Sequence, residues 1–162
     1  MAKAWLVMDR VINWVLAVLM AVMVVVIALQ VWYRFILNNP LDWSEELGRY
    51  VFVWISFLGS AAGVRYQVHL GIDVLEKIVG PDVFRYVVAL INVLTQIFLL
   101  FVIYWGFTLL TIVRFQTSPS MLIPMTYPYA AVPVGAIFML INSLRVAHAA
   151  LKGKPLDLEI KL

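Results

Sequence analysis

The residues best suited to chemistry gather in one short stretch, residues 40–50, with the sequence PLDWSEELGRY. Its acids suit the N-terminus of a helix, because the helix dipole favours negative charge there. Arg49 follows Glu45 by four residues and Glu46 by three, so either carboxylate can pair with it on a helix surface. The stretch predicts a capped helix with Trp43 as its surface anchor or, alternatively, a cluster that contacts a partner.

Catalytic or metal-binding chemistry is not favoured by the titratable residues. Glu45 and Glu46 are adjacent, and adjacent side chains on a helix point in different directions, so we do not interpret them as paired catalytic acids. Arg65, His69 and Asp73 recur every four residues and share a helix face. Arginine is not a metal ligand, and two ligands are too few for a metal site. This second set therefore predicts an ion-pair cluster at a membrane surface.

Features of the whole sequence exclude several classes of enzyme. The chain has no cysteine, which excludes disulfides, cysteine-bound zinc and iron–sulfur clusters. The sequence contains no GxSxG, HExxH or phosphate-binding glycine loop. A bis-histidine haem would need its ligands inside the bundle, whereas His69 and His148 fall outside the long apolar segments. We expect no catalytic residue, cofactor or metal in this chain.

The composition indicates an integral membrane protein. Of the 162 residues, 64% are hydrophobic and 13% are charged, and the mean hydropathy is +0.97. A soluble domain of this length buries only part of its surface, so this much apolar surface must face lipid. The net charge of +3 comes from basic residues at the ends of apolar segments. Such placement is typical of membrane orientation rather than of nucleic-acid binding.

The expected fold is all-α, with four transmembrane helices in a single membrane domain over residues 1–162. A span takes about 20 apolar residues, and the candidates cover about residues 11–33, 47–64, 84–113 and 127–146. The third is too long for a perpendicular crossing and must tilt. Between the second and third spans, apolar residues recur at helical spacing over about 66–79. This pattern predicts a short amphipathic helix in the membrane interface.

The positions of lysine and arginine predict the orientation, because cytoplasmic segments carry an excess of both. The chain has 12 such residues, and only Arg34, Arg49 and Arg114 lie on the side of the first and third connections. The other nine lie on the side of the termini and of the connection between the second and third spans. Both termini and that middle connection are therefore expected in the cytoplasm.

Small and polar residues inside the spans predict where helices meet. Gly59 and Gly63 have the GxxxG spacing that lets another helix approach closely. Asn92, Thr95 and Gln96 lie on one face of the third span, and polar groups in hydrocarbon need partners. We expect an interhelical hydrogen-bond seam there, with a substrate path as the alternative. A path is less favoured because no span carries a charged residue near its centre.

The most specific sequence features lie between Arg34 and Asp73. They are Arg34 at the end of the first span, DWSEELGRY (42–50), VWISFLG (53–59), Arg65, His69, Gly71 and Asp73. With these features the chain resembles the small membrane subunit of tripartite ATP-independent periplasmic (TRAP) transporters, the DctQ-like family. The similarity in hydropathy covers nearly the whole chain.

The resemblance implies a non-catalytic subunit in the bacterial cytoplasmic (inner) membrane. Its partners would be a large membrane subunit, which carries the substrate and sodium sites, and a soluble periplasmic protein. That soluble protein would capture an organic acid such as a dicarboxylate or sialic acid. The chain itself would be a scaffold for the large subunit and would help to dock the soluble protein. Positions carried over to the interface or docking face are Trp43, Glu45, Glu46 and Arg49, and those at the cytoplasmic edge are Arg65, His69 and Asp73.

Two alternatives belong to other functional classes. The first is a self-sufficient small carrier that works as a homodimer, which predicts a carboxylate embedded in the membrane. The second is a membrane enzyme or haem subunit, which predicts convergent histidines or acids. In every case, lipids surround the chain.

Overall fold

The computed structural model describes residues 2–66 and 81–151. Except for Tyr66, the amphipathic helix expected over residues 66–79 lies outside the described residues. The helices are α1 (Ala2–Phe35), α2 (Asp42–Tyr66), α4 (Pro81–Val113), α5 (Thr126–Tyr129) and α6 (Ala131–Leu151).

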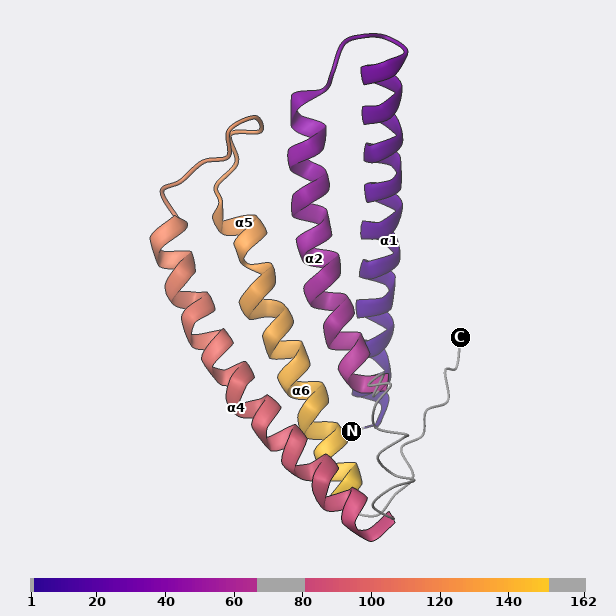
Figure 1. Ribbon diagram of the computed structural model, residues 1–162, viewed down its shortest axis with the longest axis vertical. Helices are drawn as coiled ribbons and strands as arrows, with labels where there is room; N and C mark the ends of the chain where they lie inside the picture. Colours follow the sequence, from indigo (N-terminus) through magenta and orange to yellow (C-terminus); the bar gives the residue numbers. More distant parts are fainter. Residues whose placement is uncertain (1, 67–80, 152–162) are drawn as a thin grey trace.

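Within the described residues, four segments are long and apolar enough to cross a membrane, which confirms the predicted all-α fold with four spans. The last of these segments joins the short α5 to α6. Helix α4 has 33 residues and is therefore about 50 Å long, more than the ~30 Å of a hydrocarbon core. Helix α4 is also inclined to α1 (Figure 1). The segments are Trp5–Phe35, Asp42–Val64, Ala89–Val113 and Thr126–His148.

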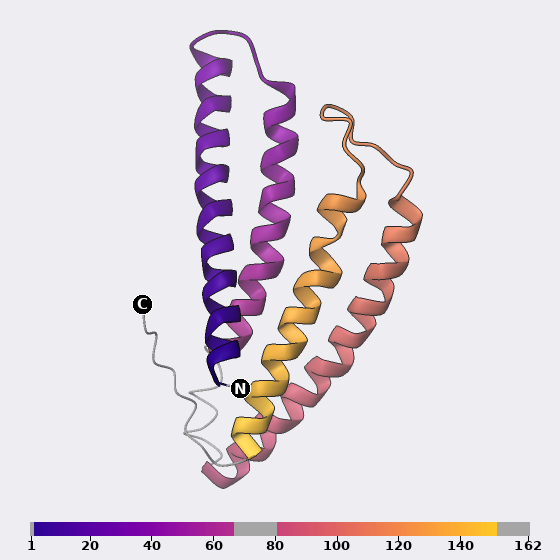
Figure 2. The ribbon, with the colours of Figure 1, turned by 180° about the vertical axis from the view of Figure 1, so that it is seen from behind.

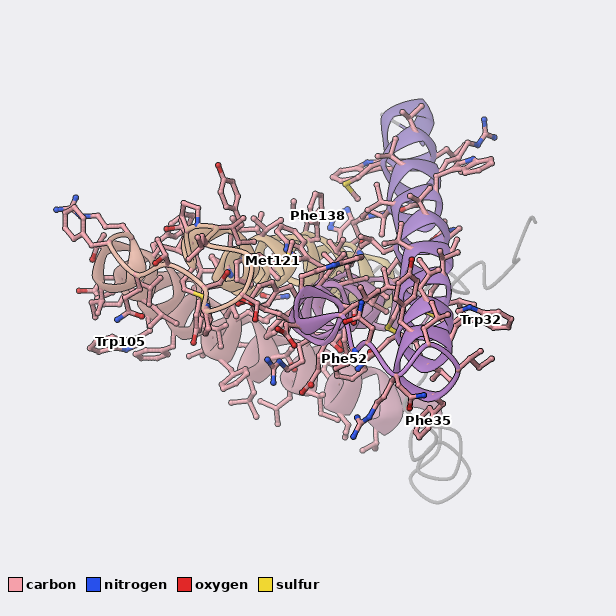
Figure 3. The ribbon with its side chains drawn as sticks, turned by 90° about the horizontal axis from the view of Figure 1, so that it is seen from above. Trp32, Phe35, Phe52, Trp105, Met121 and Phe138 are labelled. Atoms are coloured by element: carbon pink, nitrogen blue, oxygen red, sulfur yellow. The ribbon has the colours of Figure 1, made fainter. Side chains whose placement is uncertain are left out.

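The long helices stand side by side in a single layer (Figures 1 and 2). Helix α1 packs against α2, α2 against α6, and α6 against α4, so the order in space differs from the order in the chain. Seen from above in Figure 3, Trp32 and Trp105 lie toward the two ends of the layer, while Phe52 and Phe138 point to opposite sides. A single layer buries little of itself. In the most apolar window of the first span, only 11% of the residues are buried inside the chain.

Local sequence explains where the helices are interrupted. After α1, Asn38 has a φ of 49°, a left-handed conformation that asparagine adopts more readily than most residues. Pro40 follows and disfavours helical geometry in the residue before it. Helices α5 and α6 are separated at Ala130, just before Pro133. Because Pro133 has no N–H, it leaves a carbonyl of the preceding turn without its helical partner.

Helix α6 approaches both of its long neighbours at glycines. A Cβ built on Gly106 of α4 would lie 3.1 Å from the ring of Pro133 in α6. A Cβ built on Gly135 of α6 would lie 2.6 Å from the Cβ of Phe57 in α2. A glycine is needed at Gly135 because a side chain would force the two helices apart.

The predicted GxxxG residues occupy a different environment. A Cβ on Gly59 or Gly63 would meet no described atom within 4 Å. Their close approach to another helix therefore stays a prediction, and it concerns a partner outside the described part of the chain.

We predict that Gly135→Ala destabilises the protein by about 1–3 kcal/mol, because it overpacks the contact between α2 and α6. Thermal unfolding of the purified protein in a mild detergent measures the effect. Gly59→Ala is the matched control, since it adds the same methyl group to a helix where space is open. Equal melting temperatures for the two variants would contradict the packing described for Gly135.

Candidate functional site

The acidic motif at the start of α2 binds the connection between α4 and α5, which we call the outer loop (residues 114–125). Glu46 is only 2% exposed. Its Oε2 accepts hydrogen bonds from the backbone N–H groups of Ser120, at 2.8 Å, and Met121, at 3.2 Å. Its Oε1 accepts a hydrogen bond from the hydroxyl of Tyr50. One carboxylate of α2 thus fixes a loop more than 70 residues away in the chain.

The outer loop also has hydrogen bonds of its own. An isolated β-bridge joins Thr117 and Pro124. The N–H of Ser118 donates to the carbonyl oxygen of Ile123 at 2.9 Å, and the N–H of Ile123 donates to the Oγ of Ser118 at 3.3 Å. Within this frame Leu122 has a φ of 55°, which is strained for a residue with a Cβ. Its side chain is 72% exposed, so the loop holds an apolar side chain outward in an unfavourable backbone conformation.

The two adjacent glutamates have different surroundings, as expected for neighbours on a helix. The carboxylate of Glu45 lies 3.5 Å from the guanidinium of Arg49, and both side chains are about two-thirds exposed. An exposed pair of this kind adds little stability. Trp43 is also exposed, at 39%. Three of the four motif residues therefore face outward, while Glu46 faces the outer loop.

A second polar cluster joins α1 to α6 at the opposite end of the layer. Asp9 is 8% exposed, and its two carboxylate oxygens accept hydrogen bonds from both terminal nitrogens of Arg145, at 3.1 and 3.3 Å. Arg145 also donates to the Oδ1 of Asn142 at 3.0 Å, and its guanidinium lies 4.7 Å from the ring centre of Trp5. The Nδ2 of Asn142 in turn donates to the carbonyl oxygen of Ala61 in α2 at 2.8 Å. The cluster thus ties α1, α2 and α6 together.

Polar residues of the third span face α6. Ser143 Oγ donates to Asn92 Oδ1 at 3.1 Å and lies 3.4 Å from Gln96 Nε2. The hydroxyl of Thr95 instead donates to the carbonyl oxygen of Ile91 in its own helix. Asn92 and Gln96 therefore share one partner on α6, and Thr95 is not part of this contact.

The residues predicted to lie at the cytoplasmic edge are only partly described by the structure. Arg65 lies in the last turn of α2, but its side chain, His69 and Asp73 are outside the described residues. Among the residues that are described, no group of three histidine, aspartate or glutamate side chains could hold a metal ion.

Several residues of these clusters were missed by sequence reasoning. Tyr50 follows Glu46 by four residues, a spacing that could have suggested their hydrogen bond. Asp9 carries no comparable local signal, because its partner Arg145 is 136 residues away. The same holds for Ser118, whose burial follows from the fold of the outer loop.

Comparison with known proteins gives a consistent family. Residues 23–153 match the family model of the DctQ component of tripartite ATP-independent periplasmic transporters. The C4-dicarboxylate TRAP transporter small permease protein DctQ of Rhodobacter capsulatus is 34% identical over 109 residues, which are 66% of this chain and 48% of that protein. The protein of the same name from Vibrio cholerae is 26% identical, over 90% of this chain and 73% of that protein.

A longer relative is also similar. The sialic acid TRAP transporter permease protein SiaT of Haemophilus influenzae is 28% identical over 116 residues, which are 72% of this chain but 19% of SiaT. The chain therefore spans about a fifth of SiaT and about half of the Rhodobacter protein.

We predict that Asp9→Asn destabilises the protein by about 1–3 kcal/mol, because it leaves the partly buried guanidinium of Arg145 without its counter-charge. Arg145 has other contacts, so its own replacement is not a clean measure of the pair. A double-mutant cycle with Asp9→Asn and Arg145→Gln, read from unfolding in detergent, isolates the coupling. The exposed pair of Glu45 and Arg49 is the control, with an expected coupling of about 0.5 kcal/mol or less. Equal coupling at both pairs would contradict the role of the Asp9–Arg145 pair in joining α1 to α6.

Proposed function

The chain belongs to the family of DctQ components of TRAP transporters, and on this premise we propose that it is the small membrane subunit of a transporter for an organic acid. C4-dicarboxylate and sialic acid are the substrates in the names of its relatives. We propose a substrate of the same class for the assembly that contains this chain. The subunit itself would carry no catalytic residue and no cofactor.

The proposed membrane partner is a large subunit that binds the substrate and the coupling sodium ion. The match to SiaT supports this partner, because a segment similar to this chain occupies only 19% of that permease. The rest of SiaT is the kind of polypeptide that would act beside this chain. Such a partner would provide the charged and polar transport path.

The proposed role toward that partner is a scaffold, and the observation that carries it is the single layer of helices. A layer offers two broad apolar faces, and buried polar contacts hold it together at both ends. Such a layer is suited to line the stationary part of a larger membrane protein. The open space beside Gly59 and Gly63 supports a close approach of a partner helix to α2.

The proposed second role is to help dock the soluble periplasmic protein. Trp43, Glu45 and Arg49 support it, because they are exposed at the end of the layer that also carries the outer loop. We place this end in the periplasm and both termini in the cytoplasm of a bacterium, with the chain in the inner membrane. The excess of lysine and arginine at the termini and in the middle connection supports this orientation.

We predict that this chain, co-expressed with the large subunit and purified by a tag on this chain alone, recovers the large subunit in stoichiometric amount. Gly59→Leu and Gly63→Leu should lower the recovery, because they fill the space left for a partner helix. Gel filtration and mass spectrometry of the purified assembly measure the recovery of the large subunit with the parent chain and with each variant. Transport of an organic acid by this chain alone in liposomes would contradict the scaffold role and favour a homodimeric carrier. Undiminished recovery with both leucine variants would contradict only the packing face.

A further inference from the structure

We propose that Glu46 is a positioning residue, whose carboxylate holds the outer loop so that Leu122 is presented to the soluble periplasmic protein. This inference rests on the proposed docking role and assigns different tasks to residues that the sequence motif groups together. Glu46 acts through the loop, and Leu122 makes the contact.

The first observation is the number of bonds that Glu46 directs at the loop. Its Oε2 accepts from two consecutive backbone N–H groups, those of Ser120 and Met121. The hydroxyl of Tyr50 donates to the other carboxylate oxygen, Oε1, and lies 3.4 Å from the Sδ of Met125 at the end of the loop. A carboxylate with all of these neighbours inside the chain has little capacity left for a partner.

The second observation is the strain at the residue that follows these two N–H groups. Leu122 has a φ of 55°, and such conformations persist only where the surrounding structure enforces them. Here the N–H of Leu122 donates to the carbonyl oxygen of Ser118 at 3.2 Å, and the preceding residues are held by Glu46. A single exposed leucine is ordinary on a protein surface. Leu122 differs from such a leucine because its backbone is strained and the two residues before it are held by a buried carboxylate.

The third observation concerns the depth of the loop relative to the membrane. The exposed pair of Glu45 and Arg49 lies in the same turns of α2 as Glu46, with side chains 64% and 67% exposed. Charged groups this open do not lie in hydrocarbon. The loop bound at this level therefore meets water rather than lipid tails, and Figure 1 shows it beside the start of α2. Protein interfaces commonly combine an apolar anchor residue with polar and charged residues around it. Leu122 beside the pair of Glu45 and Arg49 has this composition, which favours the soluble protein over lipid as the partner.

The ordering role is tested with a spin label in the full complex with the large subunit, in lipid nanodiscs. The chain has no cysteine, so Ser120→Cys provides the sole labelling site on this chain, and it keeps the backbone N–H that Glu46 binds. Glu46→Ala should increase the mobility of the label, and Glu46→Gln should largely restore order, because its amide oxygen still accepts both N–H groups. Glu45→Ala is the matched control and should leave the mobility unchanged.

An immobile label in Glu46→Ala would overturn the ordering role. If that variant does not assemble, Tyr50→Phe removes only the hydroxyl that braces the carboxylate. It should raise the mobility in the same direction, and an unchanged label there would also overturn the proposal.

The contact role is tested with Leu122→Gly, because glycine adopts a φ of 55° without strain and removes only the side chain. The affinity of the complex for the soluble substrate-binding protein should fall about tenfold, while the spin label stays as immobile as in the parent. Phe115→Ala is the matched control, since Phe115 is 81% exposed at the same end of the layer and is not held by Glu46. Its affinity should equal that of the parent.

Unchanged affinity in Leu122→Gly would overturn the contact role and leave the proposed function intact. Loss of the large subunit from this variant would also overturn it, because the contact would then be with that subunit. A parent complex that does not bind the soluble protein at all would contradict the proposed docking itself. The mobility of the label would then still decide the role of Glu46.

Discussion

A buried carboxylate must find its hydrogen-bond partners inside the protein, and this requirement organises both ends of the helix layer. Asp9 and Glu46 are 8% and 2% exposed. Their partners come from segments 136 and more than 70 residues away in the chain. The hydrogen bonds to Asp9 fix α1 to α6 at one end, and those to Glu46 fix the outer loop to α2 at the other. Between these ends, α2 and α6 meet where Gly135 makes room for Phe57.

Because polar contacts at its two ends hold the helices together, the layer can remain one helix thick. A four-helix bundle that packs around its own core hides most of its apolar side chains, whereas this layer leaves many exposed on α1 and α4. In a membrane such exposure costs little, because lipid tails are as apolar as the side chains. The polar side chains of Asp9, Asn92 and Gln96 are each engaged with a partner on α6. The broad faces of the layer therefore remain apolar and available to lipid or to another membrane protein.

The outer end shows how one motif can hold two roles. Glu45 and Glu46 are adjacent and chemically identical, yet one lies in an exposed ion pair and the other under a loop. The separation follows from the turn of about 100° between successive residues on a helix. This is why the motif is best considered as two surfaces, one exposed and one toward the rest of the chain.

The sequence by itself determined the class of the protein, its four spans and its resemblance to a family, because these depend on composition and on local periodicity. It also indicated an ion pair within the motif, since Glu45 and Arg49 are close in the chain. Only the tertiary structure decided that α6 lies between α2 and α4, that Asp9 meets Arg145, and that Glu46 binds the outer loop. Large apolar side chains lie on exposed as well as buried faces of these helices, so hydropathy does not specify which helices are neighbours. That choice is made by a few polar and small residues, whose partners are distant in sequence and become recognisable only when the chain is folded.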